Sequence, residues 1–232
     1  MMFLGDELTT ENINNQMFRT SNNLLCRPVD VAIMQGAFYE LKKMVSKFSP
    51  DLNLSNPFLN APLHLACDPR VCPEQNYEII KFILQQPGIN INQTNAMRST
   101  PLQMAISLPD IPKYLDIISL FLQAEDIDLN HANCLGNNLA HTAAKSLQPD
   151  ALILLWRSGV NLLHKNNKSE TPLDSVKDVR FMQFKINQYE EELNNTIECL
   201  EYYQNKNPLP PAKNPYSCEM SGDVESDFFI DN

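Results

Sequence analysis

Histidine and cysteine are the side chains of this sequence best suited to chemistry, and three of them lie close together. His64, Cys67 and Cys72 fall in one short stretch. A zinc site needs three or four ligands of these types converging on one point, so the spacing raises a metal-site hypothesis. The opposing interpretation, which we favour, is that His64 and Cys67 are structural parts of a repeated motif and that Cys72 is a loop thiol.

Sequence motifs of nucleotide-binding and hydrolytic enzymes are missing from the chain. It has no Gly-rich phosphate loop, no nucleophile elbow and no His-Glu-x-x-His pattern, and it contains only six glycines. The terminal segments outside the repeats described below are too short for a separate catalytic core. We therefore predict no catalytic residue, no cofactor and no bound metal, and a protein that is not an enzyme.

The charge balance narrows the classes of partner. Acidic residues outnumber basic ones by 28 to 18, and the net charge is -10, whereas binding to a phosphate backbone requires a basic surface. Nucleic acid and anionic membranes are therefore not expected as partners. The longest apolar run, Ala151 to Trp156, is far shorter than the roughly 18–20 residues that cross a bilayer, so no membrane insertion is expected.

The first residues and the cysteines point to a cytosolic location. Asp6 and Glu7 interrupt the N-terminus before an apolar segment of the Sec type can form. The six cysteines are scattered, unlike those of a small disulfide-rich domain. We expect reduced thiols and no Sec signal.

A six-residue motif recurs along the chain. Its second position falls at residues 28, 62, 101, 139 and 172, at intervals of 34, 39, 38 and 33. A Thr or Ser before Pro caps a helix, and Pro in the first turn sacrifices no needed N–H group. The copies are Arg27-Pro-Val-Asp-Val-Ala32, Ala61-Pro-Leu-His-Leu-Ala66, Thr100-Pro-Leu-Gln-Met-Ala105, Asn138-Leu-Ala-His-Thr-Ala143 and Thr171-Pro-Leu-Asp-Ser-Val176.

Two further patterns follow the motif in phase with it. A second stretch has apolar residues at helical spacing, as in Ile79, Ile80 and Ile83. A short alternation such as Gly88-Ile-Asn-Ile-Asn92 then leads to the next copy. Each unit therefore predicts two helices and an extended loop.

These motifs resemble those of the ankyrin-repeat family. The resemblance implies an all-α ankyrin-repeat solenoid of about five helix-turn-helix repeats with hairpin loops over residues 24–178. It also implies that His64 and His141 bond backbone groups of the adjoining loop. The family usually has Gly two residues before the Thr, but only Gly136 conforms, with Leu59, Arg98 and Ser169 elsewhere. We expect those three hairpins to be distorted, or remade for binding.

The ends of the chain differ from the repeats. Residues 1–23 predict an N-terminal cap with a short helix. Residues 179–206 contain neither Pro nor Gly and carry one apolar stripe, which predicts a long capping helix that could also turn back or form a dimer. Residues 207–232 contain prolines and then acidic residues, typical of a disordered acidic tail.

The resemblance implies a non-catalytic module that binds a protein partner through hairpin tips and the concave helix face, in a chain that is a monomer or a dimer through the C-terminal helix. Candidate contacts on the tips are Phe58, Leu59, Met97, Arg98, Leu135 and Asn137. Candidate contacts on the inner helices are Leu65, Met104, Thr142 and Lys145.

The chain also resembles ankyrin-repeat effectors of intracellular bacteria, which implies virulence-related delivery into a host cell by type IV secretion. Such signals are C-terminal, with acidic and apolar residues; the candidates are Glu219, Glu225, Phe228, Phe229 and Ile230. Two alternatives stay open. One is a cytosolic ankyrin inhibitor that masks a basic partner such as a transcription factor. The other is a small modifying enzyme with a site at the long helix and the inserted loops.

Overall fold

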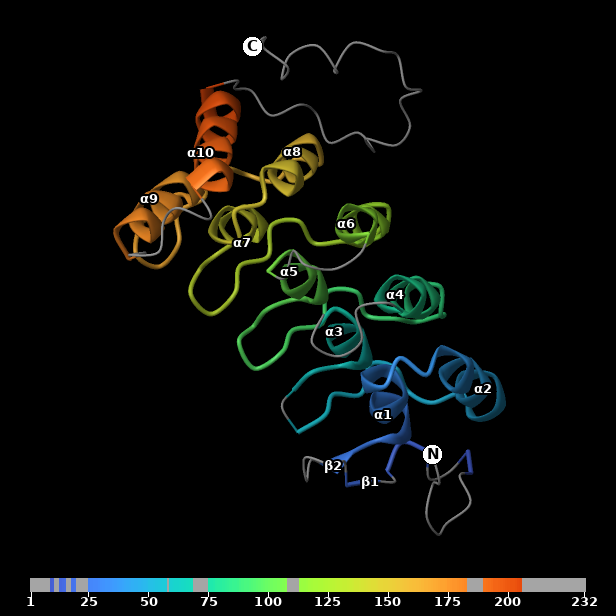
Figure 1. The fold of residues 1–232 in the computed structure, drawn as a ribbon. Helices are drawn as coiled ribbons and strands as arrows, with labels where there is room; N and C mark the ends of the chain where they lie inside the picture. The colour runs from blue at the N-terminus through green and yellow to red at the C-terminus, as the bar shows by residue number, and fades with distance from the viewer. Residues whose placement is uncertain are drawn as a thin grey trace, which may run out of the picture.

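The computed structural model describes residues 9–10, 13–15, 18–19, 25–57, 59–68, 75–107, 113–182 and 190–205. Its helices form two adjacent rows that follow the length of the molecule (Figure 1). The inner row consists of α1 (Pro28–Met34), α3 (Pro62–Ala66), α5 (Pro101–Ile106), α7 (Leu139–Lys145) and α9 (Pro172–Met182). The outer row consists of α2 (Phe38–Phe48), α4 (Asn76–Leu84), α6 (Tyr114–Leu122), α8 (Pro149–Arg157) and α10 (Glu190–Asn205).

The inner helices begin where the recurring motif predicts. Four of them start at its Pro, and α7 starts at Leu139 in the same place. The residue before Pro is held in an extended conformation, as at Thr100 (φ -80°, ψ 162°). The Thr100 Oγ1 atom also accepts a hydrogen bond from the Gln103 N–H group (3.3 Å). The motif therefore ends a loop and starts a helix in one step.

The core lies between the two rows. The inner helices bury the Leu and Ala of the motif, as at Leu63 and Ala66. The outer helices contribute Ile79, Ile80 and Ile83 from α4, and the equivalent face of α6. Successive inner helices pack on one another, as do α4, α6 and α8, so the repeats share one continuous apolar core. The fold is the predicted all-α ankyrin solenoid.

The N-terminal end carries a short antiparallel ribbon, and most of the segment expected to include a helix lies outside the described residues. Here β1 (Phe18–Arg19) pairs antiparallel with β2 (Leu25–Cys26), and each strand is two residues long. Ile13 is buried in the common core, and the Asn14 Oδ1 atom accepts a hydrogen bond from the Asp51 N–H group (2.9 Å). These contacts attach the segment to the first repeat.

The C-terminal end is covered by α10, which packs on α8 and α9. Leu200 is fully buried there, and the rings of Trp156 and Tyr203 lie 4.4 Å apart. The Lys177 Nζ and Glu201 Oε1 atoms are 3.4 Å apart, which a single straight helix through this region does not permit. The long helix expected over 179–206 is therefore divided: α10 folds back and occupies the outer-row place beside α9.

Candidate protein-interaction surface

The loops between repeats are four hairpins that share one asparagine-based turn. In the hairpin that leads to α5, the Asn95 Oδ1 atom accepts hydrogen bonds from the N–H groups of Met97 (2.9 Å) and Ser99 (3.0 Å). The Arg98 N–H group donates to the Asn95 carbonyl oxygen (2.8 Å). Asn56, Asn133 and Asn166 make the equivalent side-chain bond to the fourth residue after them, at 3.1 Å each.

The expected distortion of three hairpins is not found. Leu59, Arg98 and Ser169 have φ values of 59°, 54° and 62°, the left-handed conformation that Gly136 adopts at 75°. L-residues pay a steric penalty in that region, but the preceding asparagine satisfies the turn's N–H groups and holds the backbone there. The absence of Gly therefore leaves the turn intact.

Three apolar side chains project from these tips. Leu59, Met97 and Leu135 are 53%, 54% and 55% exposed, and Arg98 is also exposed. Phe58, predicted to belong with them, lies outside the described residues. At the fourth hairpin the place of Met97 and Leu135 is taken by exposed Lys168. We call Leu59, Met97, Arg98 and Leu135 the tip row.

Backbone hydrogen bonds connect neighbouring tips. The Cys134 N–H group donates to the Met97 carbonyl oxygen (3.0 Å), and the Asn167 N–H group donates to that of Leu135 (3.1 Å). The ring Nε2 atom of His131 donates to the Arg98 carbonyl oxygen at 2.6 Å. Because these three tips are joined in this way, Met97, Arg98 and Leu135 stand on a connected backbone, which lowers the entropy lost when a partner binds.

The fourth residue of each internal motif joins its helix to the next hairpin. The His64 Nδ1 atom accepts from the Ala61 N–H group (3.2 Å), and its Nε2 atom donates to the Ser99 carbonyl oxygen (3.1 Å). Gln103 makes the same two bonds through its amide, to the Thr100 N–H group (3.2 Å) and the Asn137 carbonyl oxygen (2.9 Å). The structural role predicted for His64 is confirmed.

His141 occupies the same place with a different ring environment. Both ring nitrogens face oxygen atoms, Asn138 Oδ1 at 2.7 Å and the Glu170 carbonyl at 2.9 Å, an arrangement that favours the protonated ring. Burial acts in the opposite direction and is the larger effect, so the pKa of His141 is lowered. Burial likewise lowers the pKa of His64. The lowered pKa favours the neutral ring in both histidines, and a neutral His141 ring can donate to only one of its two oxygen neighbours.

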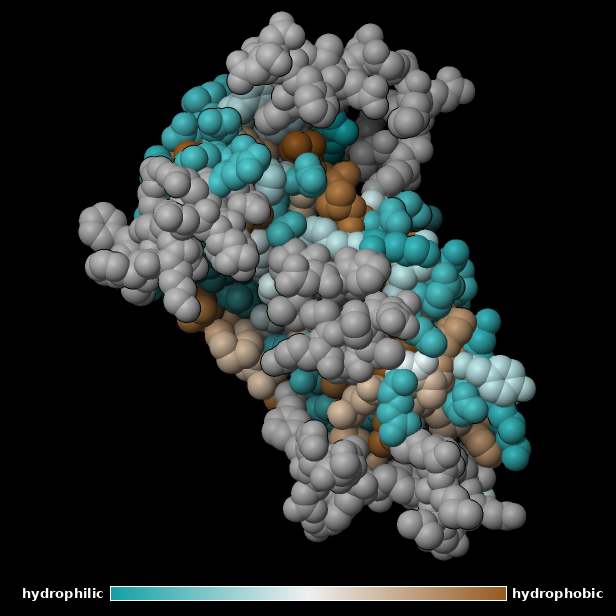
Figure 2. Space-filling view, in the orientation of Figure 1, coloured by the Kyte–Doolittle hydropathy of each residue, from teal (hydrophilic) through white to brown (hydrophobic). Residues whose placement is uncertain are grey.

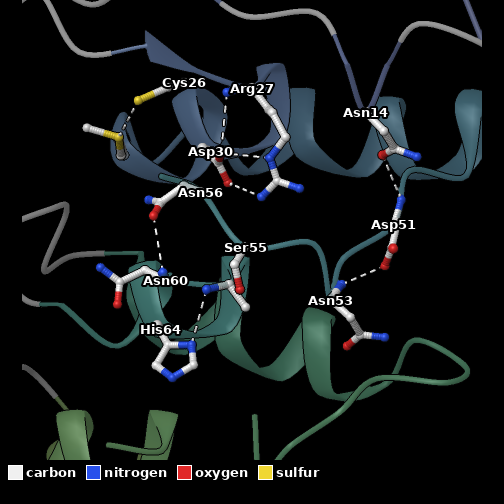
Figure 3. Close-up of polar contacts among 12 residues, drawn as sticks. Asn14, Cys26, Arg27, Asp30, Asp51, Asn53, Ser55, Asn56, Asn60 and His64 are labelled. Carbon is white, nitrogen blue, oxygen red and sulfur yellow. Dashed lines mark hydrogen bonds and ion pairs between the residues drawn. The ribbon is translucent and has the colours of Figure 1, made fainter. Parts of the chain in front are cut away.

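The terminal motifs have Asp in that place. Asp30 is fully buried and pairs with the Arg27 guanidinium, at 2.8 and 2.9 Å (Figure 3). Asp174 is exposed and accepts from the Thr171 N–H group (2.9 Å), which lowers the pKa of its carboxyl. Neither carboxylate can donate to a following hairpin.

The remaining predicted contacts fall in different environments. Leu65 lies in the core, and Asn137 is buried, where its Oδ1 atom accepts from Asn166 Nδ2 (3.0 Å). These two are corrections: helix packing and the hairpin network occupy both side chains. Met104 and Thr142 are half-buried, and Lys145 is exposed beside them on the inner row.

The structure describes only some of the residues named in the metal-site and signal hypotheses. Cys67 is buried, and burial raises the pKa of its thiol, while Cys72 lies outside the described residues. Among the residues that the structure describes, no three His, Cys, Asp or Glu side chains are grouped to hold a metal ion. No described helix combines the length and the apolar character needed to cross a bilayer. The five candidate signal residues of the tail lie outside the described ranges.

Sequence reasoning missed the asparagines that form the hairpins. Asn56, Asn95, Asn133 and Asn166 recur at intervals of 39, 38 and 33, in phase with the motif that follows each of them. Their spacing is a turn signal that the expectation of Gly at this turn does not include. Asn supports a turn through its side-chain oxygen, a mechanism that does not need Gly.

The comparison with known proteins agrees with this class of fold. Residues 59–96 match the family model of the ankyrin repeat. The chain is similar to neurogenic locus notch homolog protein 1 of Chinese hamster, mouse and rat, with 27% identity over 131 residues. The match covers 56% of this chain but spans 5% of the length of those relatives. Ankyrin repeats indicate a protein–protein interaction module, and the family is generally non-catalytic.

Proposed function

We propose that this chain is a non-catalytic module that binds a partner protein through the tip row. The observation that carries the proposal is that three apolar side chains, each more than half exposed, stand on successive hydrogen-bonded turns; Met97 and Leu135 share one turn position, and Leu59 takes the next one, which Arg98 occupies in its own hairpin. Exposed apolar groups that gather on one side commonly mark interaction sites. Met104, Thr142 and Lys145 extend the surface toward the inner helices, and Phe58 adjoins it in sequence.

The chemistry of the tip row defines what it can recognise. Leu59, Met97 and Leu135 favour apolar side chains of a partner, and methionine adapts its shape to irregular surfaces. Arg98 lies next to Met97 and supplies a guanidinium that can pair with a carboxylate. The partner surface that fits is therefore apolar with at least one acidic group.

The test replaces the three apolar side chains together. Full-length chain and the variant Leu59→Ser/Met97→Ser/Leu135→Ser are used to recover bound proteins from cell lysate, with quantification by mass spectrometry. The matched control is Leu54→Ser/Leu163→Ser, because these side chains are also exposed (39% and 46%) but lie off the tip row. We expect partners to be lost from the triple variant and kept by the control; equal loss from both would contradict the proposal.

We also propose that the chain is a type IV effector, and the acidic C-terminal composition of the sequence supports this. A reporter enzyme fused to the N-terminus of the chain would enter host cells only if the tail directs delivery. Replacing Phe228, Phe229 and Ile230 by Ser should abolish entry while the tip row continues to bind its partner. Delivery unchanged by that replacement would contradict this assignment.

A further inference from the structure

The outer row carries lysines that lie over aromatic rings. Lys42 Nζ is 4.7 Å from the ring centre of Phe38 and 5.7 Å from that of Phe82. Those two rings meet edge to face at 5.8 Å and so connect α2 with α4. Tyr39, one position from Phe38, is 74% exposed. Figure 2 shows hydrophilic and hydrophobic side chains interleaved over this part of the molecule.

Lysines also lie over an aromatic ring on the side of α4 that faces α6. Lys81 and Lys113 lie 5.8 and 4.4 Å from the ring centre of Tyr77. A groove of ≈ 610 Å³ separates α2 from α4 and is lined by Tyr39, Lys42 and Phe82 among others. A second groove of ≈ 730 Å³ separates α4 from α6 and is lined by Tyr77 and Lys81 among others. The outer lysine–aromatic surface is defined as Tyr39, Lys42, Lys43, Tyr77, Lys81, Phe82 and Lys113.

The charge of this surface is opposite to that of the whole chain. The stretches 38–48, 76–84 and 113–122 contain five lysines against three carboxylates, a local charge of +2 in a chain of net charge -10. Within the part that the structure describes, none of these lysines makes an ion pair with a carboxylate. An ammonium that rests on a ring keeps other N–H groups free to bind an anion.

We propose that this surface binds the acidic segment 219–231 of the same chain. That segment holds five carboxylates and no basic residue, and it includes Phe228 and Phe229. Its carboxylates match the lysines, and its phenylalanines match the grooves beside the aromatic rings. The proposal does not depend on the tip row, which is built from the hairpins and not from the outer helices.

The chain length permits this contact. Thirteen residues, 206–218, separate the end of α10 from the acidic segment and span at most about 45 Å when extended. The outer row passes from α10 through α8 and α6 to α4, three helix spacings of about 8–10 Å each. The segment therefore reaches both grooves that flank α4.

The test is zero-length carbodiimide cross-linking of the full-length chain, which joins a lysine to a carboxylate only in direct contact. Equal amounts of unlabelled and nitrogen-15-labelled protein are mixed, so that mass spectrometry separates links within one chain from links between two chains. We expect links from the tail carboxylates to Lys42, Lys43, Lys81 or Lys113 within one chain, weakened by high salt. Links found only between chains, or concentrated on Lys145 and Lys165, would overturn the proposal.

Charge-reversal variants test whether the cross-links depend on the lysines of this surface. Lys42→Glu/Lys81→Glu alters exposed side chains, and tail links are then read at the unchanged Lys43 and Lys113. We expect these links to fall by about five-fold or more because the attraction is electrostatic. The control Lys145→Glu/Lys165→Glu makes the same charge change on exposed positions elsewhere. Equal loss in the control, or no loss in the test variant, would contradict docking on this surface; circular dichroism verifies that both variants are folded.

Discussion

The internal and the terminal repeats place different side chains at one position of the recurring motif. His64, Gln103 and His141 each donate a hydrogen bond to a carbonyl of the next hairpin. Among the described residues, Asp30 and Asp174, in the first and last motifs, accept bonds from their own repeat and from no other. The position thus has two tasks: Asp30, His64, Gln103 and Asp174 accept a bond at the helix start, and the internal residues His64, Gln103 and His141 donate to the next hairpin.

The two ends differ from each other as well. Asp30 is completely buried, so its charge requires the Arg27 guanidinium beside it. Asp174 is exposed and needs no cation for solvation. A carboxylate at the motif position therefore costs little folding free energy where it is exposed to water, as at Asp174. Where it is buried, as at Asp30, it needs a paired cation.

The largest effect is expected from removing the cation at the first repeat. Arg27→Met leaves the Asp30 carboxylate buried and unpaired, which should lower the free energy of unfolding by about 3–5 kcal/mol. Urea denaturation followed by circular dichroism measures the loss. Arg27→Met/Asp30→Asn should recover most of it, since the neutral amide oxygen can still accept the bond from the backbone N–H group of residue 27. An unchanged urea midpoint for Arg27→Met would show that the pair is dispensable.

The second effect tests the donor at an internal repeat. His64→Ala leaves the Ala61 N–H group and the Ser99 carbonyl without their partner and should cost about 2–4 kcal/mol. His64→Gln should cost less than about 1 kcal/mol, because Gln103 makes both bonds in the next repeat. His64→Asp, which imitates the terminal motifs, should cost at least as much as Ala. Equal losses for Gln and Ala would mean that ring packing, not hydrogen bonding, is what this position contributes.

The third effect is a pH dependence of stability to which the buried histidine of an internal repeat contributes. Burial lowers the pKa of His64 in the folded chain below its value in the unfolded chain, so the unfolded state binds more protons at mildly acidic pH. Stability should therefore be retained above about pH 6.5 and decline as the pH falls from there toward the folded pKa, by at most about 1.4 kcal/mol per pH unit for this histidine.

Urea midpoints at several pH values measure this slope. His64→Gln should make it shallower than in the parent chain, and the remaining slope reports the other histidines together with carboxylates at lower pH. His131→Gln is the control, because the half-buried His131 lies in a hairpin and not in the motif. A slope that His64→Gln leaves unchanged would contradict the assignment.

The sequence predicted the repeat architecture well because its signals are local. Pro, Leu and Ala each act through their own helix, so their spacing identified α3, α5 and α9, whereas the structural role of His64 was expected from the family resemblance. The buried positions of Leu65 and Asn137 were not predicted, because each depends on a neighbouring repeat. Asn137, for example, is covered by Asn166, which lies 29 residues away.

The outer lysine–aromatic surface was not predicted for the same reason. Lys42, Phe38 and Phe82 belong to two repeats whose relative placement decides whether the rings meet. Helical spacing within one repeat could not show that Lys42 lies over two rings. The N-terminal ribbon was likewise invisible, since a pairing of two residues per strand leaves no period to detect.

The smallest effect concerns the hairpins that lead into an internal and a terminal repeat. Ser169, before the terminal repeat, has a φ of 62° and an exposed side chain. Ser169→Gly should raise the free energy of unfolding by roughly 0.5–1 kcal/mol, because relief of the left-handed strain exceeds the added freedom of the unfolded chain. Urea denaturation measures the gain.

The matched control is the opposite replacement, Gly136→Ala, in the hairpin before an internal repeat. A Cβ atom there would lie 2.6 Å from the Asn167 backbone nitrogen, so the next hairpin must move and the Asn167 N–H bond to Leu135 must weaken. Gly136→Ala should therefore destabilise by more than Ser169→Gly stabilises. If both replacements change stability by less than about 0.3 kcal/mol, the asparagine alone determines the turn. The close approach of the two hairpins at Gly136 then contributes nothing to stability.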